Sequence, residues 1–582
     1  MLGERSDQLG LFQADHYYLD LVGRESFYGQ LAVARDRLFR DDDFAMLYCL
    51  DNGRPSVPPS LLAAALLLQA HDKVSDEEAI SRSNFDVRWC VALGIEIASE
   101  PFVKSTLWLF RSQLVIHEQA GAIFQASLEE AKRNGFLRGK KRTIALDTTP
   151  IFGKGAVKDT YNLLATGIVM LARALATAAL QEPAEWALGH DFSRYFGSSV
   201  KGEAAINWDK KAERDAFLAS IVGDAQRLLQ LARGTLSELS SDDLVVGPIR
   251  QAAALLCQLL VQDIDGFDSD EPHLKDGVSK DRMPSATDPD MRHGRKSKSN
   301  RFDGHKAALA VDTETGLITD ADVIAGNAPD NVNALELVTG TEDNTGCEVG
   351  KTIGDCAYGD GATREKFEQA ERDLVARTPG RPEGQLSKDE FAIDLERDCV
   401  TCPGGHTMQG SVSRPRDGQP ARMFQFPAAV CAACPLREQC VKGKGGRLLT
   451  IHPQEALLQR ARAYEATDEF REDVIKRQVV EHRIARLAQL GIRKSRSFGR
   501  RKTKFQLLMA SAVANLTLVW GGSLPADGEA SAEGHEDTSN AALALSSSLL
   551  RGLRGSLRAL GGFMNALWSP APRCRPVAAA GC

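Results

Sequence analysis

Three acidic residues that lie far apart in the sequence, Asp147, Asp355 and Glu481, have the types and settings from which a metal site can be built. Each aspartate follows a short apolar run, in "RTIALDTTPIFG" and in "KTIGDCAYGDG", and the glutamate lies in a polar segment with helical spacing. Three converging carboxylates repel one another, so at least one is expected to take up a proton unless a cation is bound. A divalent cation removes this conflict.

The type of ligand restricts the choice of cation. Carboxylate oxygens are hard ligands, which favour Mg2+ or Mn2+ over zinc. Two such ions about 3.5 to 4 Å apart can activate an attacking oxygen and stabilise the leaving oxygen of a phosphodiester. The acids therefore predict phosphoryl transfer with two ions, although each acid taken alone is equally explained as a turn residue or a solvated helix residue.

The elements that must position these acids can be predicted from periodicity. In "RTIALDTTPIFG", Ile144 and Leu146 share one face of a strand that has Asp147 at its end and is stopped by Pro150. "HKAALAVD", "TETG" and "LITDADVI" predict an antiparallel hairpin with Gly316 in its turn.

A second strand that ends in an acid is predicted at "KTIGD", followed by a loop, "CAYGDGA", and a helix, "TREKFEQAERD". Both aspartates are then expected at the carboxyl ends of strands. We also expect the glycines of the loop to leave room for a metal ion and a DNA phosphate. This order of elements predicts an α/β protein with a ribonuclease-H-like mixed sheet.

The remaining segments surround this core. A proline pair at 58 and 59, a capping box of Ser75 with Glu78, and Ser105 are predicted to open three N-terminal helices, the last ended by Gly135. These helices fit a DNA reader and an ordinary helical bundle equally well. Asp159 is predicted to cap the first helix of a long insertion. The late helix is expected over about 467–490, with four apolar residues on or near one face: Val474, Val480, Ile484 and Leu487.

We predict five segments from these patterns. They are an all-α N-terminal domain at 1–135, the first part of the core at 136–379 with a helical insertion at about 160–285, a Cys-rich insertion at 380–455, the C-terminal core helices with Glu481 at 456–520, and a low-complexity tail at 521–582 that is expected to be disordered.

Charge is unevenly distributed over the 582 residues, whose net charge is −7. Between Arg292 and Lys306, six Lys or Arg accompany one acid, and between Gly491 and Lys504, seven accompany none. Such segments indicate contact with a polyanion, or solvated loops. The most apolar run, 167–180, is too short to span a bilayer and contains Arg173, so we expect a cytoplasmic protein without membrane contact.

Five of the twelve cysteines crowd into residues 399–440. Two C-x2-C pairs can supply four thiolates to a structural zinc ion: Cys399, Cys402, Cys431 and Cys434. The 28 residues between the pairs exceed the usual interval, and His406 and Cys440 are further candidates, so the ligand set stays open. Free thiols and disulfides are the alternatives.

Taken together, these motifs resemble the DDE transposases of bacterial insertion sequences, in the branch with an N-terminal helical domain and a cysteine-bearing insertion. The resemblance runs from about residue 12 to about residue 520 and rests on order and spacing. It passes through "GRPSVPPSLLAAALLLQ", "PFVKSTLWLFRSQL", "DPDMRHGRKSKSNRFDGHKAALAVD", "GNAPDN", "GDCAYGDGATRE", "CVTCPGGH", "CAACPLREQC" and "VVEHRIARL".

The resemblance implies that Asp147, Asp355 and Glu481 form the catalytic, metal-binding triad of a ribonuclease-H-like core. It also implies that the "GNAPDN" corner, with Asn327 and Asp330, lies near the active site. The helical N-terminal domain at 1–135 is predicted to bind DNA. Cationic residues elsewhere are also predicted to contact DNA: Arg477, Arg295, Lys296, Lys298, Lys306, Arg500, Arg501 and Lys502.

The surroundings of the third acid depart from the family pattern. Only Arg477, four residues before Glu481, stands where the family has a basic residue, and it is predicted to clamp a phosphate or to form a plain ion pair. The usual tyrosine position is Val474 and the usual lysine position is Ala488, for which Arg483 or Arg486 can substitute.

The function implied is that of a transposase in the bacterial cytoplasm, at the nucleoid. It would bind the terminal inverted repeats of its element, cut the DNA with metal-activated water, and join the 3′-hydroxyl to target DNA. Two ends must be held together, so at least a homodimer is expected on DNA. The alternatives are an inactive, repurposed transposase that only binds DNA and a nuclease of the same fold that cuts without joining.

Overall fold

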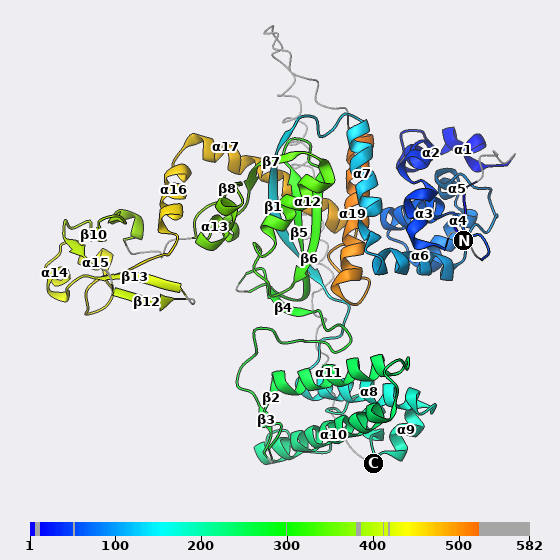
Figure 1. The fold of residues 1–582 in the computed structure, drawn as a ribbon, viewed down its shortest axis with the longest axis horizontal. Coiled ribbons are helices and arrows are strands. Elements are labelled where there is room, and N and C mark those ends of the chain that lie inside the picture. The colour runs from blue at the N-terminus through cyan, green and yellow to red at the C-terminus, as the bar shows by residue number, and fades with distance from the viewer. Residues whose placement is uncertain are drawn as a thin grey trace, which may run out of the picture. The chain divides into compact units, whose positions relative to one another are not determined.

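A mixed sheet of six strands forms the centre of the fold, in the order β4-β5-β1-β7-β8 with β6 beside β5 (Figure 1). β1, β7 and β8 are parallel, whereas β4, β5, β6 and β1 pair antiparallel through β5. The bounds are β1 Lys141–Phe152, β4 Arg292–Arg295, β5 Arg301–Asp312, β6 Ile318–Ala325, β7 Glu348–Ile353 and β8 Asp373–Val375. The predicted α/β, ribonuclease-H-like core and its hairpin, with Gly316 in the turn at φ 73°, are confirmed.

The computed structural model describes residues 1–5, 12–49, 53–269, 271–297, 299–379, 386–410, 412–416 and 419–522, with side chains of 412–416 and 419–421 excepted. Residues 1–522 form one unit. The predicted tail at 521–582 lies outside the described residues from 523 onwards.

The sequence predicts that the first strand stops at Pro150, but the strand continues to Phe152. Its pairing with β7 ends at Ala145, whereas its pairing with β5 continues through Pro150 opposite Lys306. From Leu146 to Ile151 the strand therefore has a ladder partner on one side only, before a bridge to Lys494 forms on the other side at Phe152. A proline that lacks an N–H is tolerated in such a stretch. Asp147 consequently lies within the strand and not at its end.

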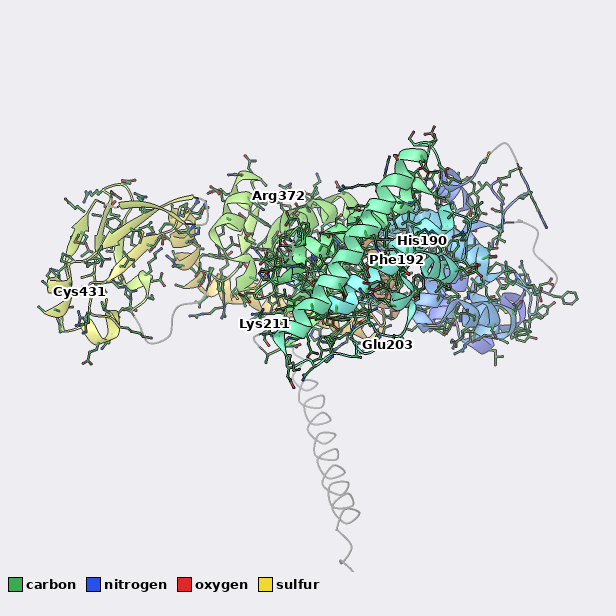
Figure 2. The ribbon with its side chains drawn as sticks, turned by 90° about the horizontal axis from the view of Figure 1, so that it is seen from below. His190, Phe192, Glu203, Lys211, Arg372 and Cys431 are labelled. Atoms are coloured by element: carbon green, nitrogen blue, oxygen red, sulfur yellow. The ribbon has the colours of Figure 1, made fainter. Side chains whose placement is uncertain are left out.

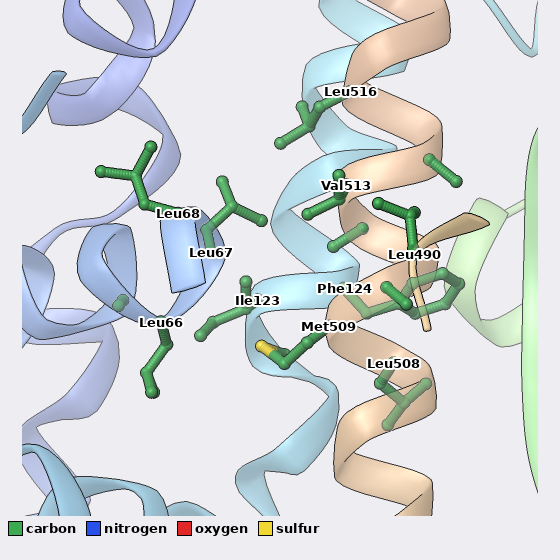
Figure 3. Packing of buried hydrophobic residues seen from close by; sticks show 14 of the residues in the cluster. Leu66, Leu67, Leu68, Ile123, Phe124, Leu490, Leu508, Met509, Val513 and Leu516 are labelled. Carbon is green, nitrogen blue, oxygen red and sulfur yellow. The ribbon is translucent and has the colours of Figure 1, made fainter. Parts of the chain in front are cut away.

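The N-terminal helices share a hydrophobic core with the C-terminal helix α19, Arg500–Gly521. Figure 3 shows leucines 66 to 68 of α3, Ile123 and Phe124 of α7, and Val513 of α19 in this cluster. Helix α3 is apolar all round, which suits a buried helix. The bounds are α1 Ala14–Val22, α2 Phe27–Leu38, α3 Pro59–Asp72, α4 Asp76–Phe85, α5 Val87–Leu93, α6 Lys104–Ile116 and α7 Ala122–Arg133.

Local signals for the ends of these helices are partly confirmed. Pro59 begins α3, and the hydroxyl of Ser75 accepts from the Glu78 amide at the start of α4. Ser105, in contrast, is not a cap, because α6 begins one residue earlier. The single helix expected from Ser105 to Gly135 is two helices, separated where Glu118 takes a left-handed φ of 58°. The second of them, α7, packs against α19, a tertiary contact that outweighs local propensity.

The insertion after β1 is a separate four-helix cluster with its own core. Asp159 caps its first helix, α8, as predicted, by accepting from the amides of Tyr161 and Asn162. Helix α8 is long and apolar enough to cross a membrane, but it packs against α10 and α11, and 56% of its most apolar window is buried. The bounds are α8 Thr160–Ala178, α9 Pro183–Gly189, α10 Lys211–Glu238 and α11 Val246–Asp263, followed by two short strands, β2 Ile264–Asp265 and β3 His273–Leu274.

The Cys-rich segment contains more regular structure than its weak periodicity indicates. Two small three-stranded sheets and two short helices surround a core of seven buried residues. The bounds are β9 Ala392–Asp394, β10 Cys399–Thr401, β11 Thr407–Gln409, β12 Val412–Arg416, β13 Gln419–Gln425, β14 Leu448–Ile451, α14 Ala428–Ala432 and α15 Arg437–Cys440.

The remaining helices follow β6 and β7 in the first part of the core and β14 in its last part. The late helix expected over about 467–490 is divided at Arg477 into two helices, and its predicted apolar face is buried at Val480 and Leu487. The bounds are α12 Ala334–Thr345, α13 Gly361–Gln369, α16 Glu455–Glu465, α17 Asp468–Lys476 and α18 Gln478–Gln489.

Candidate active site

Parallel pairing of β1 with β7 brings two of the three acids to neighbouring places on the sheet. Ala145 of β1 pairs with Ile353 of β7, and in each strand the aspartate follows two residues later. Asp147 then pairs with Leu309 on β5, while β7 has ended. Asp355 caps the 3-10 turn after β7 by accepting from the Ala357 amide at 2.8 Å. The sheet therefore places the two acids side by side, although 208 residues separate them in the chain.

Arg477 connects the first acid to the third. Its Nη1 donates to Oδ2 of Asp147 at 3.0 Å, and its Nη2 donates to Oε1 of Glu481 at 3.0 Å. Glu481 lies in the first turn of α18, four residues after Arg477, so both side chains lie on the same helix face. The side chain of Asp147 is 21% exposed and that of Glu481 is 61% exposed. One guanidinium thus joins a half-buried acid to an exposed one.

The surroundings of Asp147 favour its protonated form. Burial raises the pKa of this carboxyl above the ordinary aspartate value, and the charge of Asp355 raises it further. The Thr148 amide, which donates to Oδ1 of Asp147 at 2.7 Å, and the guanidinium of Arg477 act in the opposite direction. Asp147 is therefore the acid whose charge a bound cation would relieve most.

Tyr358 is a buried polar residue of this site that the sequence did not single out. Its side chain is fully buried, and its hydroxyl has no hydrogen-bond partner among the described residues. Burial raises the pKa of this phenol well above its usual value, and the charges of Asp147, Asp330 and Asp355 raise it further. The signal was present in "GDCAYGDG", because Tyr358 follows Asp355 by three residues.

Asp330 of the predicted "GNAPDN" corner lies beside the first strand. Its Oδ1 accepts from the hydroxyl of Thr148 and from Nζ of Lys306, each at 2.7 Å. Asn327, from the same corner, donates instead to Asp281 and to the Lys280 carbonyl. Asp330 therefore belongs to the surroundings of Asp147, whereas Asn327 ties the corner to the end of the insertion.

The glycines around Asp355 do not leave open space, contrary to the expectation. A Cβ on Gly354 would lie 2.7 Å from the Tyr358 side chain, and one on Gly359 would meet the Arg377 carbonyl oxygen at 1.8 Å. A Cβ on Gly361 would meet His452 at 2.6 Å. These positions are glycine because other parts of the protein pack against the loop.

The residues predicted to contact DNA differ in their availability. Arg295 and Lys296 are exposed, and Lys298 lies outside the described residues. Lys306 is only 8% exposed and bonds to Asp330, so a contact with a phosphate would require that ion pair to open. Of the remaining predicted residues, Arg500, Arg501 and Lys502 lie in the first turn of α19, whereas Arg477 lies in the acid site.

In that turn, Arg500 lies near Asp290 and Arg501 pairs with Glu118 at 3.3 Å. Lys502 is exposed, and no partner for its ammonium is present within the described ranges. Cations at a helix N-terminus oppose the helix dipole. Their gathering there is consistent with a bound polyanion.

The cysteines predicted to bind zinc are only partly brought together. Cys402, Cys431 and Cys434 line one cavity of about 20 Å3 together with Cys440 and His406. Cys399 is absent from the described lining of this cavity. Figure 2 labels Cys431 in the yellow Cys-rich segment. All five cysteines are free thiols.

No three or more His, Cys, Asp or Glu side chains in the described part of the chain are placed so that they could hold a metal ion as they stand. In the acid site, the guanidinium of Arg477 lies between Asp147 and Glu481 and provides the positive charge. The donor set fits a divalent cation nonetheless, because it consists of hard carboxylate oxygens and includes one whose pKa is raised. Holding the ion requires Arg477 to move from at least one carboxylate.

Comparison with known families accounts for most of the chain. A family described as "Transposase domain (DUF772)" matches residues 16–113. Two families described as "Transposase DDE domain" match residues 259–409, which include Asp355, and residues 401–520, which include Glu481.

The chain belongs to the DDE transposases. No curated protein matches it. Strand β1 with Asp147 lies outside the three matched ranges; the sheet pairing places this acid beside Asp355, and Arg477 links it to Glu481. Membership of the DDE transposases implies an enzyme that modifies nucleic acid by phosphoryl transfer, and hence one that binds DNA.

Proposed function

We propose that the protein is an active transposase of a bacterial insertion sequence, which binds the terminal inverted repeats of its element and catalyses metal-dependent strand cleavage and strand transfer into target DNA. The observation that carries the proposal is the meeting of Asp147, next to Asp355 on the sheet, with Arg477 and Glu481 from α18. We assign the cytoplasm, at the nucleoid, as its location and at least a homodimer as the state that acts on paired ends.

The three acids have distinct tasks in this proposal. Asp147 and Asp355, held by neighbouring strands, would bind Mg2+ or Mn2+ from a rigid base, and Glu481 would complete the site from the helix. The chemistry that bound divalent cations supply at such a site is activation of the attacking oxygen and stabilisation of the leaving oxygen of a phosphodiester.

Arg477 and the cations of α19 would orient the DNA. Once released from a carboxylate, the guanidinium of Arg477 can donate two parallel hydrogen bonds to a phosphate beside the acids. The exposed Lys502, with Arg500 and Arg501, would neutralise phosphates further along the duplex. These contacts set position and not sequence.

The deciding experiment is cleavage of a duplex that carries the flanking inverted repeat, by wild type and by Asp355→Asn, with Mg2+ or with EDTA. We expect the variant to bind the duplex like wild type and to lose cleavage by at least about 100-fold, since even residues that merely support metal ligands contribute about 10 to 100-fold. Asp360→Asn is the matched control in the same loop: Asp360 caps α13 by accepting from the amides of Ala362 and Thr363. Asparagine caps a helix about as well as aspartate does, so this variant should change stability little and leave cleavage intact.

Three outcomes would decide against the proposal. Full cleavage by Asp355→Asn would remove Asp355 from the site. Binding by wild type without cleavage under any divalent metal would favour the DNA-binding protein, and cleavage without joining to a target plasmid would favour the nuclease.

A further inference from the structure

The small cavity in the Cys-rich segment is lined by four thiols that come from two different parts of that segment. Cys402 follows β10 in the turn of the β10–β11 hairpin, whereas Cys431, Cys434 and Cys440 belong to α14, to the turn after it and to the end of α15. Sequence spacing had suggested one pair from each side. The structure supplies one thiol from the hairpin and three from the stretch that contains α14, α15 and the turn between them.

Strand alternation explains why Cys399 is left out. In β10, the side chain of Val400 is fully buried in the core of the segment. Successive side chains of a strand point to opposite faces, so Cys399 and Thr401 lie on the face away from this core. Cys402, which comes after the strand has ended, packs against the core instead.

The backbone around the cavity is arranged as thiolate ligands require. The hairpin turn closes with hydrogen bonds from the Cys402 amide to the His406 carbonyl and from the Gly405 amide to the Cys402 carbonyl, each 2.9 Å long. A Cβ on Gly404 would lie 3.0 Å from Sγ of Cys434 and 3.6 Å from Sγ of Cys402, so this glycine lets the turn approach both sulfurs.

One sulfur already accepts a hydrogen bond from the backbone. The amide of Arg447 donates to Sγ of Cys431 at 3.4 Å. Groups that hydrogen-bond to metal ligands orient them and tune their basicity. An amide directed at a sulfur is such a group.

We propose that Cys402, Cys431, Cys434 and Cys440 bind one structural zinc ion, and that Cys399 is not a ligand. Four thiolates are the donor set of a closed tetrahedral zinc site. The cavity of about 20 Å3 accommodates roughly one water-sized particle, which suits a single ion and excludes a multi-atom cluster. The sulfurs surround the cavity without yet meeting at one centre, so binding requires them to draw inward.

Zinc would also compensate for the small size of this part of the protein. Among its described side chains, seven form the buried hydrophobic core, one of which is that of Cys440 itself. Such a core rarely stabilises a separate module, and a structural metal is a common remedy. The site has no open position and would not take part in cleavage.

The test is the zinc content of the full-length protein, purified without a metal-affinity tag and measured by inductively coupled plasma mass spectrometry. We expect about one zinc per chain. Serine at any one of the four proposed ligands should lower the zinc content severely, whereas two matched controls in the same hairpin, Cys399→Ser and His406→Ala, should retain it.

A second measurement does not depend on ligand variants that could misfold, because it compares only the wild type and Cys399→Ser. Co2+ added to the metal-free wild type and to Cys399→Ser should give the same intense sulfur-to-cobalt charge-transfer absorption. Zinc-free wild type from zinc-supplemented cells, or loss of zinc in Cys399→Ser with retention in Cys440→Ser, would overturn the assignment. Neither readout depends on DNA cleavage, so the zinc site and the transposase activity fail independently.

Discussion

Nη1 of Arg477 lies 3.0 Å from Oδ2 of Asp147, across 330 residues of sequence, and the same guanidinium holds Glu481 through Nη2. The side chain that the sequence suggested as a phosphate clamp therefore also supplies the positive charge between two of the acids. On the proposed function, a divalent cation would compete with Arg477 for these two carboxylates. The guanidinium released from an acid could then meet a phosphate.

This competition predicts that Arg477→Gln binds Mg2+ more tightly than wild type. Loading the wild-type site would break at least one of the two charged hydrogen bonds of Arg477, so we expect a difference of about 1 to 2 kcal/mol, or about tenfold in affinity. The increase in melting temperature with Mg2+ concentration measures it. DNA cleavage by the variant should nevertheless fall, because the phosphate contact is lost.

The matched control for Arg477 is Arg471→Gln on the preceding helix. Arg471 is 72% exposed and pairs with the exposed Asp468, so its removal should leave the Mg2+ response unchanged. Equal Mg2+ responses of Arg477→Gln and wild type would show that the guanidinium and the cation do not share ligands.

A pH dependence follows from the raised pKa of Asp147. Because the native state holds this proton more tightly than the unfolded chain, the resulting stability is complete below the ordinary aspartate pKa and is lost as the pH rises through the raised value. Without Mg2+, wild type should thus lose stability relative to Asp147→Asn as the pH rises above about 4, the ordinary aspartate pKa. Mg2+ should restore the lost stability at the higher pH values and have no effect near pH 4.

Melting temperatures of the two proteins over this range, with and without Mg2+, check the prediction. Comparison with Asp147→Asn is necessary because burial raises the pKa of Asp320 to about 6, and this group titrates in both proteins. Parallel curves for the two proteins would mean that Asp147 titrates as an ordinary aspartate.

The hydroxyl of Tyr358 gives a third prediction. A buried hydroxyl without a partner costs about 1 to 3 kcal/mol, so Tyr358→Phe should be as stable as wild type or more stable. Tyr28→Phe is the contrasting variant, because the Tyr28 hydroxyl donates to Asp72 at 2.8 Å, and its removal should destabilise the protein by about 1 kcal/mol. Thermal melting compares them, and a large loss in Tyr358→Phe would reveal a partner for this hydroxyl.

Salt dependence tests the cations at the start of α19. Each phosphate contact removed should lower the slope of log affinity against log salt by about 1 for duplex DNA. Lys502→Gln should have this effect, and adding Arg500→Gln and Arg501→Gln should increase it. Lys504→Gln, in the same helix but paired with Asp322 at 2.9 Å, should have a smaller effect. Unchanged slopes would show that this segment is solvated and does not bind DNA.

Local patterns in the sequence were sufficient for much of the framework. Alternating apolar residues predicted β1, the β5–β6 hairpin and β7, and single polar residues predicted the caps of α4 and α8. These features depend on neighbours within a few residues, so they are readable without the fold. The acids could be selected for the same reason, since Asp147 and Asp355 each follow an apolar run.

Tertiary contacts decided what local patterns could not. Pro150 was read as a stop because the sequence does not show that β1 has a partner on one side only at this proline. The glycines around Asp355 were read as open space because local sequence does not show that the ring of Tyr358, from the same loop, and Arg377 and His452, from other parts of the chain, fill that space.

For the cysteines and the acids too, local sequence decided some features and tertiary contacts decided others. Spacing paired Cys399 with Cys402, but the alternation of side chains along β10 turned Cys399 away and left Cys440, from α15, at the cavity. By itself, the sequence determined which residues have the chemistry for phosphoryl transfer and for metal binding. Only the tertiary structure decided which of them meet, because contacts such as that of Arg477 with Asp147 arise from the packing of a helix on a sheet and leave no trace in local sequence.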